Sequence, residues 1–207
     1  MILKVLNSGS VGNCYTLTSD AGEVLIIEAG VSAMELKESF NFVLSNVSGV
    51  LLSHSHGDHS KYIKEFMNLG LKAFTGKETV NALNLSSHYL NTVEELESFK
   101  VGSFTIVPFN AKHDVQCFGF LISHPEMGLT VFLTDSYFIE YTFKDVNHFI
   151  VEANFCENKI RSFVDSGSLE DFRRNRLLKS HLSIQNCIRL LHANKLNETR
   201  NIVLIHL

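Results

Sequence analysis

A short histidine-rich segment constrains this chain more than any other feature of its sequence. Residues 53–60 read Ser-His-Ser-His-Gly-Asp-His-Ser and hold four side chains able to bind a metal: His54, His56, Asp58 and His59. The apolar residues 49–52 before them predict a strand, and the apolar spacing after them predicts a helix to about residue 69. The four side chains are therefore expected on a tight loop between a strand and a helix.

The spacing of these side chains suits a metal site. On an extended segment, side chains two apart point to the same side, so His54 and His56 can face one ion. Gly57 lets the backbone turn and carries Asp58 and His59 to a neighbouring position. Imidazole and carboxylate together suit zinc, with manganese or iron as alternatives. A polar turn that happens to be rich in histidine is the simpler interpretation, but it gives these side chains no structural purpose.

The pattern His54-x-His56-x-Asp58-His59 resembles the signature of the metallo-β-lactamase fold superfamily, and the match is complete. The resemblance implies an α/β (α+β) fold, a four-layer αββα sandwich with a two-metal site at one edge of its two sheets. It also implies hydrolysis, without choosing the substrate. Because no internal repeat, low-complexity tract or linker is evident, we expect residues 1–207 to form a single domain of this fold.

Composition limits the class of protein. A chain of 207 residues with 45% hydrophobic and 19% charged residues is typical of a globular domain with a sizeable core. A net charge of −4 gives no overall basic field, so a polyanion would need a local patch. The four cysteines are far apart and are expected to be reduced thiols. With no secretory h-region and no apolar run that approaches a membrane span, we expect a cytoplasmic protein without membrane contact.

The first 28 residues predict a three-stranded meander, with strands at 2–6, 14–18 and 23–28. The first turn, residues 8–13, reads Ser-Gly-Ser-Val-Gly-Asn and is longer than a hairpin needs. It is either a plain glycine-rich loop or a rim loop that touches substrate. With the following cysteine it resembles the opening of the cytosolic WalJ/YycJ-like hydrolases. Glu28 stands where the family usually has an aspartate that orients a metal-bound histidine, and we do not count it as a ligand.

The remaining elements alternate along the chain. Ser32 is a suitable N-cap for a helix over residues 33–44 that would bury Met34, Leu36, Phe40 and Val43. Further helices are expected at 76–85 and 184–193. Strands are expected at 72–75, 104–109, 117–123, 129–134, 146–152 and 201–205.

The resemblance assigns further ligands to three strand ends. His113 lies where the superfamily places the third ligand of its first site. Asp135 follows a buried strand and needs a partner; it fits the aspartate that bridges the two metals, with a helix-capping role as the alternative. His206 matches the final ligand of the second site. Because only Leu207 follows and chain ends fray, we expect a central strand to hold His206.

Two later segments resemble phosphodiesterase members of the superfamily. Glu152-Ala-Asn-Phe is similar to the Glu-Ala-Thr-Phe segment of the tRNA 3′-processing branch, and Ser-His181-Leu-Ser is similar to a histidine element of the phosphodiesterases. In those enzymes the histidine, positioned by the glutamate, supports phosphoryl chemistry. The alternative for His181 is a helix-cap neighbour or a buried histidine. We expect four other histidines to lie outside the site: His88, His124, His148 and His192.

A basic run precedes His181. Residues 159–179 hold six basic and three acidic side chains, a net charge of +3. The run is either a solvated helical face or a phosphate-contacting patch beside the site.

These assignments predict a metal-dependent hydrolase that uses two divalent ions, zinc in preference to manganese or iron. One ion would be held by His54, His56 and His113, and the other by Asp58, His59 and His206, with Asp135 bridging them. Two ions lower the pKa of a shared water, and the resulting hydroxide attacks the ester. Asp58, His181 and Glu152 are the expected catalytic residues, with His181 assisting the leaving oxygen.

The pair of His181 and Glu152 favours a phosphodiester substrate, and so a phosphodiesterase or nuclease acting on nucleic acid. A cyclic nucleotide, as in phage anti-Pycsar enzymes of this fold, is the main rival. Acyl or thioester hydrolysis of the lactonase or glyoxalase type is a second class, and a non-catalytic binding domain is a third. The sequence leaves the oligomeric state open, and a homodimer is compatible with it.

Overall fold

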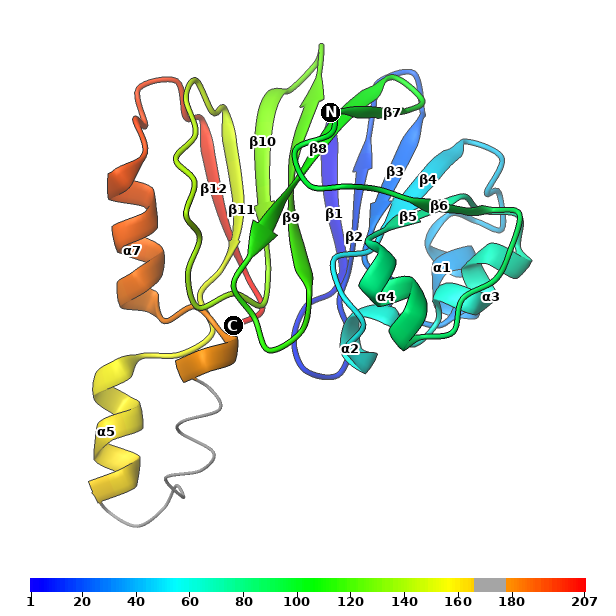
Figure 1. Cartoon of the computed structure of the whole chain (residues 1–207). Helices are drawn as coiled ribbons and strands as arrows, with labels where there is room; N and C mark the ends of the chain where they lie inside the picture. Colours follow the sequence, from blue (N-terminus) through cyan, green and yellow to red (C-terminus); the bar gives the residue numbers. More distant parts are fainter. Residues whose placement is uncertain (166–177) are drawn as a thin grey trace.

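Two six-stranded sheets form the centre of the part of the chain described by the computed structural model, residues 1–165 and 178–207 (Figure 1). In the first sheet the strands follow chain order: β1 (Ile2–Asn7), β2 (Cys14–Thr18), β3 (Val24–Ile27), β4 (Val47–Leu51), β5 (Ala73–Thr75) and β6 (Leu90–Thr92). The first three are antiparallel, as the predicted meander requires, and β3 to β6 are parallel.

Parallel strands need crossover connections, and short helices supply most of them. They are α1 (Ala33–Ser39), α2 (Gly57–Ser60), α3 (Ile63–Asn68) and α4 (Lys77–Ala82). Since parallel strands point the same way, the segments that follow β3 and β4 leave the sheet at one edge. The histidine-rich segment follows β4 and therefore lies at that edge.

The second sheet has the order β12-β11-β10-β9-β8-β7. Its strands are β7 (Phe99–Val101), β8 (Phe104–Ala111), β9 (Cys117–His124), β10 (Gly128–Leu133), β11 (His148–Glu152) and β12 (Asn201–Ile205). Strands β10, β11 and β12 are parallel, and α5 (Glu157–Asp165) and α7 (Ile184–Ala193) lie in the connection between the last two. The segments that follow these three strands therefore also leave the sheet at a common edge.

Three hydrophobic clusters divide the molecule into layers. Along β3, Leu25 and Ile27 face the cluster between the sheets, whereas Ile26 faces the cluster with α1 and α3, because successive strand residues point to opposite sides. A third cluster packs Cys187 of α7 against Phe149 of β11. The order is helix, sheet, sheet, helix, which confirms the predicted four-layer fold (Figure 1).

Several predicted elements differ in length. The helix expected over 33–44 begins at its Ser32 cap, with a capping box to Glu35, but ends at Ser39. Positive φ angles at Asn41 and Phe42 turn the chain away. The predicted burial of Met34 and Val43 is wrong, since they are 57% and 58% exposed. The helix predicted after the histidine-rich segment is split into α2 and α3, and the three-residue strands β6 and β7 were too short for the pattern to indicate.

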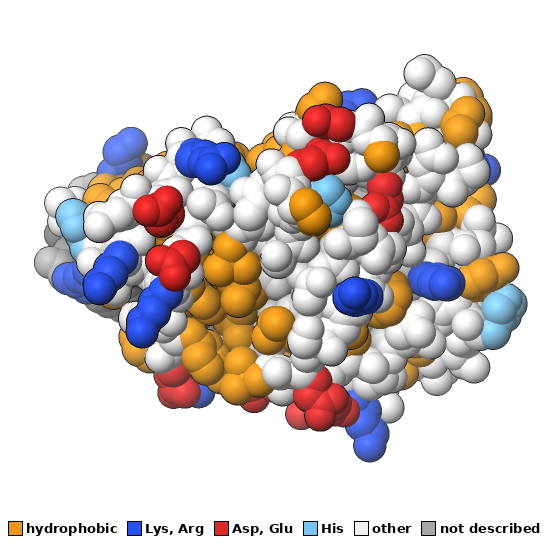
Figure 2. All heavy atoms as spheres, turned by 90° about the horizontal axis from the view of Figure 1, so that it is seen from above, with side chains coloured by type: hydrophobic (Ala, Val, Ile, Leu, Met, Phe, Trp, Pro, Cys, Tyr) orange, Lys and Arg blue, Asp and Glu red, His pale blue; other side chains and the backbone are white. Residues whose placement is uncertain are grey.

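The face of the molecule shown in Figure 2 carries basic and acidic side chains side by side, together with one patch of hydrophobic side chains. No single sign of charge dominates that face. Among residues 1–165 and 178–207, no helix has both the length and the apolar character that crossing a membrane requires.

Candidate metal centre

The edge at which strands of both sheets end forms a cavity of about 610 Å³. Its lining includes six of the residues singled out in the sequence: His56, Asp58, His113, Asp135, His181 and His206. They come from α2, from the ends of β8, β10 and β12, and from the segment that leads into α7. Residues far apart in the chain meet here because their strands end at a common edge.

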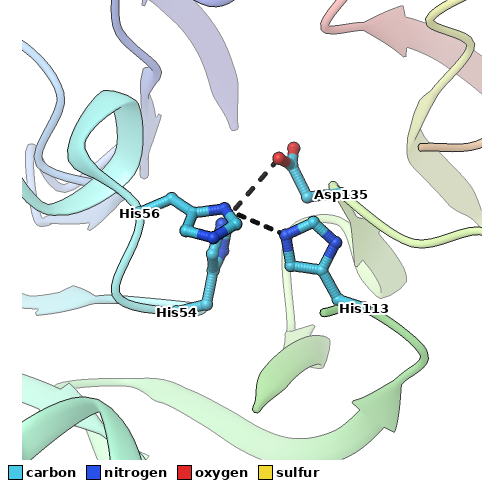
Figure 3. A group of neighbouring side chains, drawn as sticks. All are labelled: His54, His56, His113 and Asp135. Carbon is cyan, nitrogen blue, oxygen red and sulfur yellow. Dashed lines mark hydrogen bonds and ion pairs between the residues drawn. The ribbon is translucent and has the colours of Figure 1, made fainter. Parts of the chain in front are cut away.

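The first group of side chains comprises His54, His56, His113 and Asp135, whose ligand-capable atoms all lie within 4.8 Å of one another (Figure 3). His113 Nε2 lies 3.0 Å from His56 Nδ1. His54 Nε2 lies 3.8 Å from an Asp135 carboxylate oxygen. This is the set that the sequence predicts for one ion, together with the predicted bridging aspartate.

The second group comprises Asp58, His59, Asp135 and His206, again within 4.8 Å. His59 Nε2 lies 3.1 Å from Asp58 Oδ2 and 3.2 Å from Asp135 Oδ1. His206 Nε2 lies 3.6 Å from Asp58 Oδ2. Asp135 belongs to both groups and thus occupies the position expected of a bridging ligand.

Glu152 joins a third group, with Asp135, His181 and His206. One of its oxygens, Oε1, lies 2.7 Å from His181 Nδ1 and 2.9 Å from His206 Nδ1. The other, Oε2, accepts hydrogen bonds from the backbone N–H groups of Ser136 and Leu182. The sequence predicted the contact with His181. It did not predict the contact with His206, which exists only because β11 and β12 are adjacent.

Further polar side chains lie close to a second ring nitrogen of three of the histidines. Ser53 Oγ lies 2.8 Å from His54 Nδ1, and Asp114 Oδ1 lies 3.3 Å from His56 Nε2. Glu28, fully buried and at a positive φ of 69°, places Oε2 3.6 Å from His59 Nδ1. Such outer partners fix the tautomer and orientation of a ligand. The sequence predicted this role for Glu28 but not for Ser53 and Asp114, whose only signal is that each directly precedes or follows a histidine of the site.

The groups fit divalent metal ions. His54 Nε2 and His206 Nε2 are buried without a hydrogen-bond partner among the described residues, although carboxylates lie 3.8 and 3.6 Å away. An unsatisfied buried polar atom costs about 1–3 kcal/mol. A cation between imidazole and carboxylate would satisfy both, and a mixed nitrogen and oxygen set suits a borderline ion such as zinc, manganese or iron.

The charges of the side chains support the same conclusion. Burial lowers the pKa of His54 and of His113, so both rings are neutral. Burial also opposes charge on His206, but the neighbouring Asp135 and Asp58 carboxylates outweigh burial and raise the pKa of His206 to about 11. The Asp135 carboxylate raises the pKa of His59 in the same way. The carboxylates thus hold two protonated imidazoles where cations would bind.

The strand that carries His206 is not the central strand expected from the sequence. β12 lies at the edge of its sheet and pairs with β11. Side chains hold its end instead: the backbone N–H of His206 donates to Ser8 Oγ at 2.8 Å, and its carbonyl accepts from Asn154 Nδ2 at 3.0 Å. These two hydrogen bonds take the place of those that a second neighbouring strand would make.

The four histidines expected to lie outside the site belong to none of these three groups. His124, for example, lies on β9 and hydrogen-bonds Ser103 at 2.8 Å. Three of the six basic residues of the predicted patch, Arg173, Arg174 and Arg176, fall within residues 166–177, which lie outside the described residues.

Comparison with known proteins agrees with the fold. Residues 8–69, which include the histidine-rich segment, match the model of the metallo-beta-lactamase superfamily. The chain is 25% identical over 173 residues to exodeoxyribonuclease YycJ of Bacillus anthracis; the match covers 76% of this chain and 64% of that relative.

Two solved structures have the same fold. The metallo-beta-lactamase fold protein YhfI of Bacillus subtilis aligns with a TM-score of 0.73 at 17% identity, covering 99% of this chain and 84% of its own. The short form of human tRNase Z aligns with a TM-score of 0.66 at 13% identity, covering 100% and 92%. An αββα sandwich with clustered histidines and aspartates at the sheet edge can hold divalent metal ions there. Residues 8–69 thus match the metallo-β-lactamase superfamily in sequence, and the chain has the metallo-β-lactamase fold.

Proposed function

We propose that this protein is a phosphodiesterase or nuclease that acts on nucleic acid with two divalent metal ions, zinc in preference to manganese or iron. The observation that carries the proposal is the hydrogen-bonded pair of Glu152 and His181 beside the two ligand groups. Nucleases are also among its relatives: YycJ is an exodeoxyribonuclease, and tRNase Z has the same fold. Acyl hydrolysis requires no such histidine.

In the proposed site, His54, His56 and His113 would hold one ion, and Asp58, His59 and His206 would hold the other. Asp135 lies in both groups and would be shared between the two ions. Bound ions lower the pKa of a water molecule and neutralise the charge of the phosphate. The protein positions these ligands by the hydrogen bond between Ser53 and His54 and by the carboxylates of Asp114 and Glu28, which lie beside His56 and His59.

His181 supplies the proton for the leaving group. Burial alone would lower its pKa, but the hydrogen bond to Glu152 outweighs burial and the net effect is a raised pKa. With Nδ1 held by Glu152, its other ring nitrogen, Nε2, is free to donate a proton into the cavity. The attacking water oxygen forms a bond to phosphorus and releases one of its protons to solvent, the opposite P–O bond breaks, and the departing oxygen takes the Nε2 proton.

Asp58 orients the attacking water. Burial alone would raise the pKa of Asp58, but the neighbouring His206 and His59 rings outweigh burial and hold the carboxyl ionised. It lies on the cavity wall with His181 and His206. A carboxylate at that place accepts a hydrogen bond from the water as it attacks.

The test is hydrolysis by zinc- or manganese-loaded protein of three substrates: a labelled single-stranded oligonucleotide, a cyclic mononucleotide and a thioester. We expect cleavage of the oligonucleotide, with a loss of about 10²- to 10⁴-fold in His181→Ala because general acid catalysis contributes that much. Replacement of the bystander His192 by Ala is the matched control and should leave the rate unchanged. Cleavage of the cyclic nucleotide alone would assign signal degradation, and thioester cleavage that tolerates His181→Ala would overturn the proposal.

A further inference from the structure

Asp58 and His206 reach the second ligand group from different sheets, and three side chains of the first hairpin connect them. Ser8 Oγ accepts a hydrogen bond from the backbone N–H of His206 at 2.8 Å and lies 2.9 Å from the Tyr15 hydroxyl. The Tyr15 hydroxyl donates to Asn13 Oδ1 at 3.0 Å. Asn13 Nδ2 in turn donates to Asp58 Oδ2 at 3.3 Å.

The donor and the acceptor of every hydrogen bond between His206 and Asp58 can be assigned. The backbone of Gly9 fixes the Asn13 amide, since its N–H donates to Oδ1 and its carbonyl accepts from Nδ2. The second Nδ2 hydrogen therefore points towards Asp58. Because Tyr15 donates its only proton to Asn13, Ser8 must donate to the Tyr15 oxygen. The bonds run in one direction, an arrangement in which each strengthens the next.

Packing alone does not explain a tyrosine at this place. Tyr15 and Asn13 are fully buried, and the Tyr15 ring packs edge-on against Phe132 of the opposite sheet at 5.5 Å. A phenylalanine would fill the same apolar space without a hydroxyl that needs partners. Burial raises the pKa of the Tyr15 phenol, so the hydroxyl keeps its proton and remains a donor.

We infer that Ser8, Tyr15 and Asn13 form a positioning network that sets the spacing between Asp58 and His206 and thereby the affinity of the second metal ion. The inference rests on the ligand assignment of the proposed function. It gives a role to the long first turn, which a hairpin alone does not need, and it explains how a ligand on an edge strand is held. The residues act through the ligands and do not touch substrate.

Titration of metal-free protein with zinc, followed by calorimetry, tests the network without measuring activity. In Tyr15→Phe we expect the first equivalent to bind as in wild type and the second to bind about 10- to 100-fold more weakly, the usual effect of losing an outer partner. Cobalt titration followed by absorbance should show the same loss in the second step. Tyr89→Phe, which also removes a hydroxyl from a partly buried ring, should leave both steps unchanged.

Ser8→Ala, a smaller change at a half-buried position, provides an independent variant. If the three side chains form one hydrogen-bond network, the double variant Ser8→Ala/Tyr15→Phe should weaken binding of the second zinc equivalent little more than either single change. The effects of substitutions at interacting residues are not additive. Additive losses, equal weakening of both equivalents, or unchanged binding would overturn the inference while the proposed function stood. A wild-type protein that binds one ion only would overturn the ligand assignment and the inference together.

Discussion

At the scale of single residues, Glu152 has the most demanding position in the site. Its carboxylate accepts from four directions: the Nδ1 atoms of His181 and His206 on one oxygen, and two backbone N–H groups on the other. A glutamine amide in its place would point its NH₂ group at two of these four donors, whichever way the amide were turned. The position therefore requires a charged carboxylate, which also keeps His181 protonated.

The pH dependence of the rate tests this role. His181 acts in its protonated form, and its raised pKa keeps that form present above pH 6.5, so activity should fall only as the pH rises through the raised pKa. In Glu152→Gln, measured at saturating metal, we expect this alkaline limb to move to lower pH. An unmoved limb would show that His181 is not the acid.

At the scale of elements, two turns approach each other too closely for ordinary side chains. A Cβ on Gly30, which follows β3, would overlap the carbonyl oxygen of Asp58 and the backbone nitrogen of Asn13. A Cβ on Gly12 would overlap the carbonyl of Gly30. Glycine at these positions lets the first turn reach the histidine-rich segment, with a 2.7 Å hydrogen bond from Asn13 N to the Asp58 carbonyl.

Gly30→Ala should therefore destabilise the protein by about 1–3 kcal/mol, as overpacking does, and weaken the second metal equivalent by displacing Asp58. Thermal unfolding and zinc titration would measure the two effects. Gly57→Ala is the matched control for stability, because a Cβ there meets no atom within 4 Å. Equal unfolding temperatures for the two variants would contradict the close approach of the turns.

At the scale of the whole molecule, the ligand groups join the two sheets. His54, Asp58 and His59 follow β4 of the first sheet, whereas Asp135 and His206 follow β10 and β12 of the second. Bound ions would therefore stabilise the sandwich as well as supply chemistry. A ligand present at 1,000 times its Kd adds about 4 kcal/mol to folding.

Removing metal with a chelator should lower the unfolding temperature, by about 2–4 °C for each kcal/mol in a chain of this size, and adding zinc should restore it. Asp135→Ala should lose this response because both ion sites share Asp135. His181→Ala should keep it, since His181 is assigned to chemistry and not to an ion in the first two groups. A chelator-insensitive wild type would contradict the proposed metal sites.

The sequence, through its resemblance to the superfamily, predicted the fold class and the candidate ligands. Four of these residues lie within six positions of the chain, and the resemblance assigned His113, Asp135 and His206, each of which follows an apolar strand. Local chemistry also predicted the Ser32 cap and the bounds of α7 and β12. Where short-range preferences decide the outcome, the prediction and the structure agree.

Only the tertiary structure decided which side chains support the site. Ser8, Asn13 and Asp114 are ordinary polar residues in the sequence, and the Glu152 contact with His206 spans 54 positions. The edge position of β12 likewise depends on the order of strands in the sheet, and the apolar pattern of the sequence does not encode that order. Apolar periodicity reports which face of an element is buried, whereas hydrogen bonds between distant turns arise only when the sheets pack and their strand ends meet.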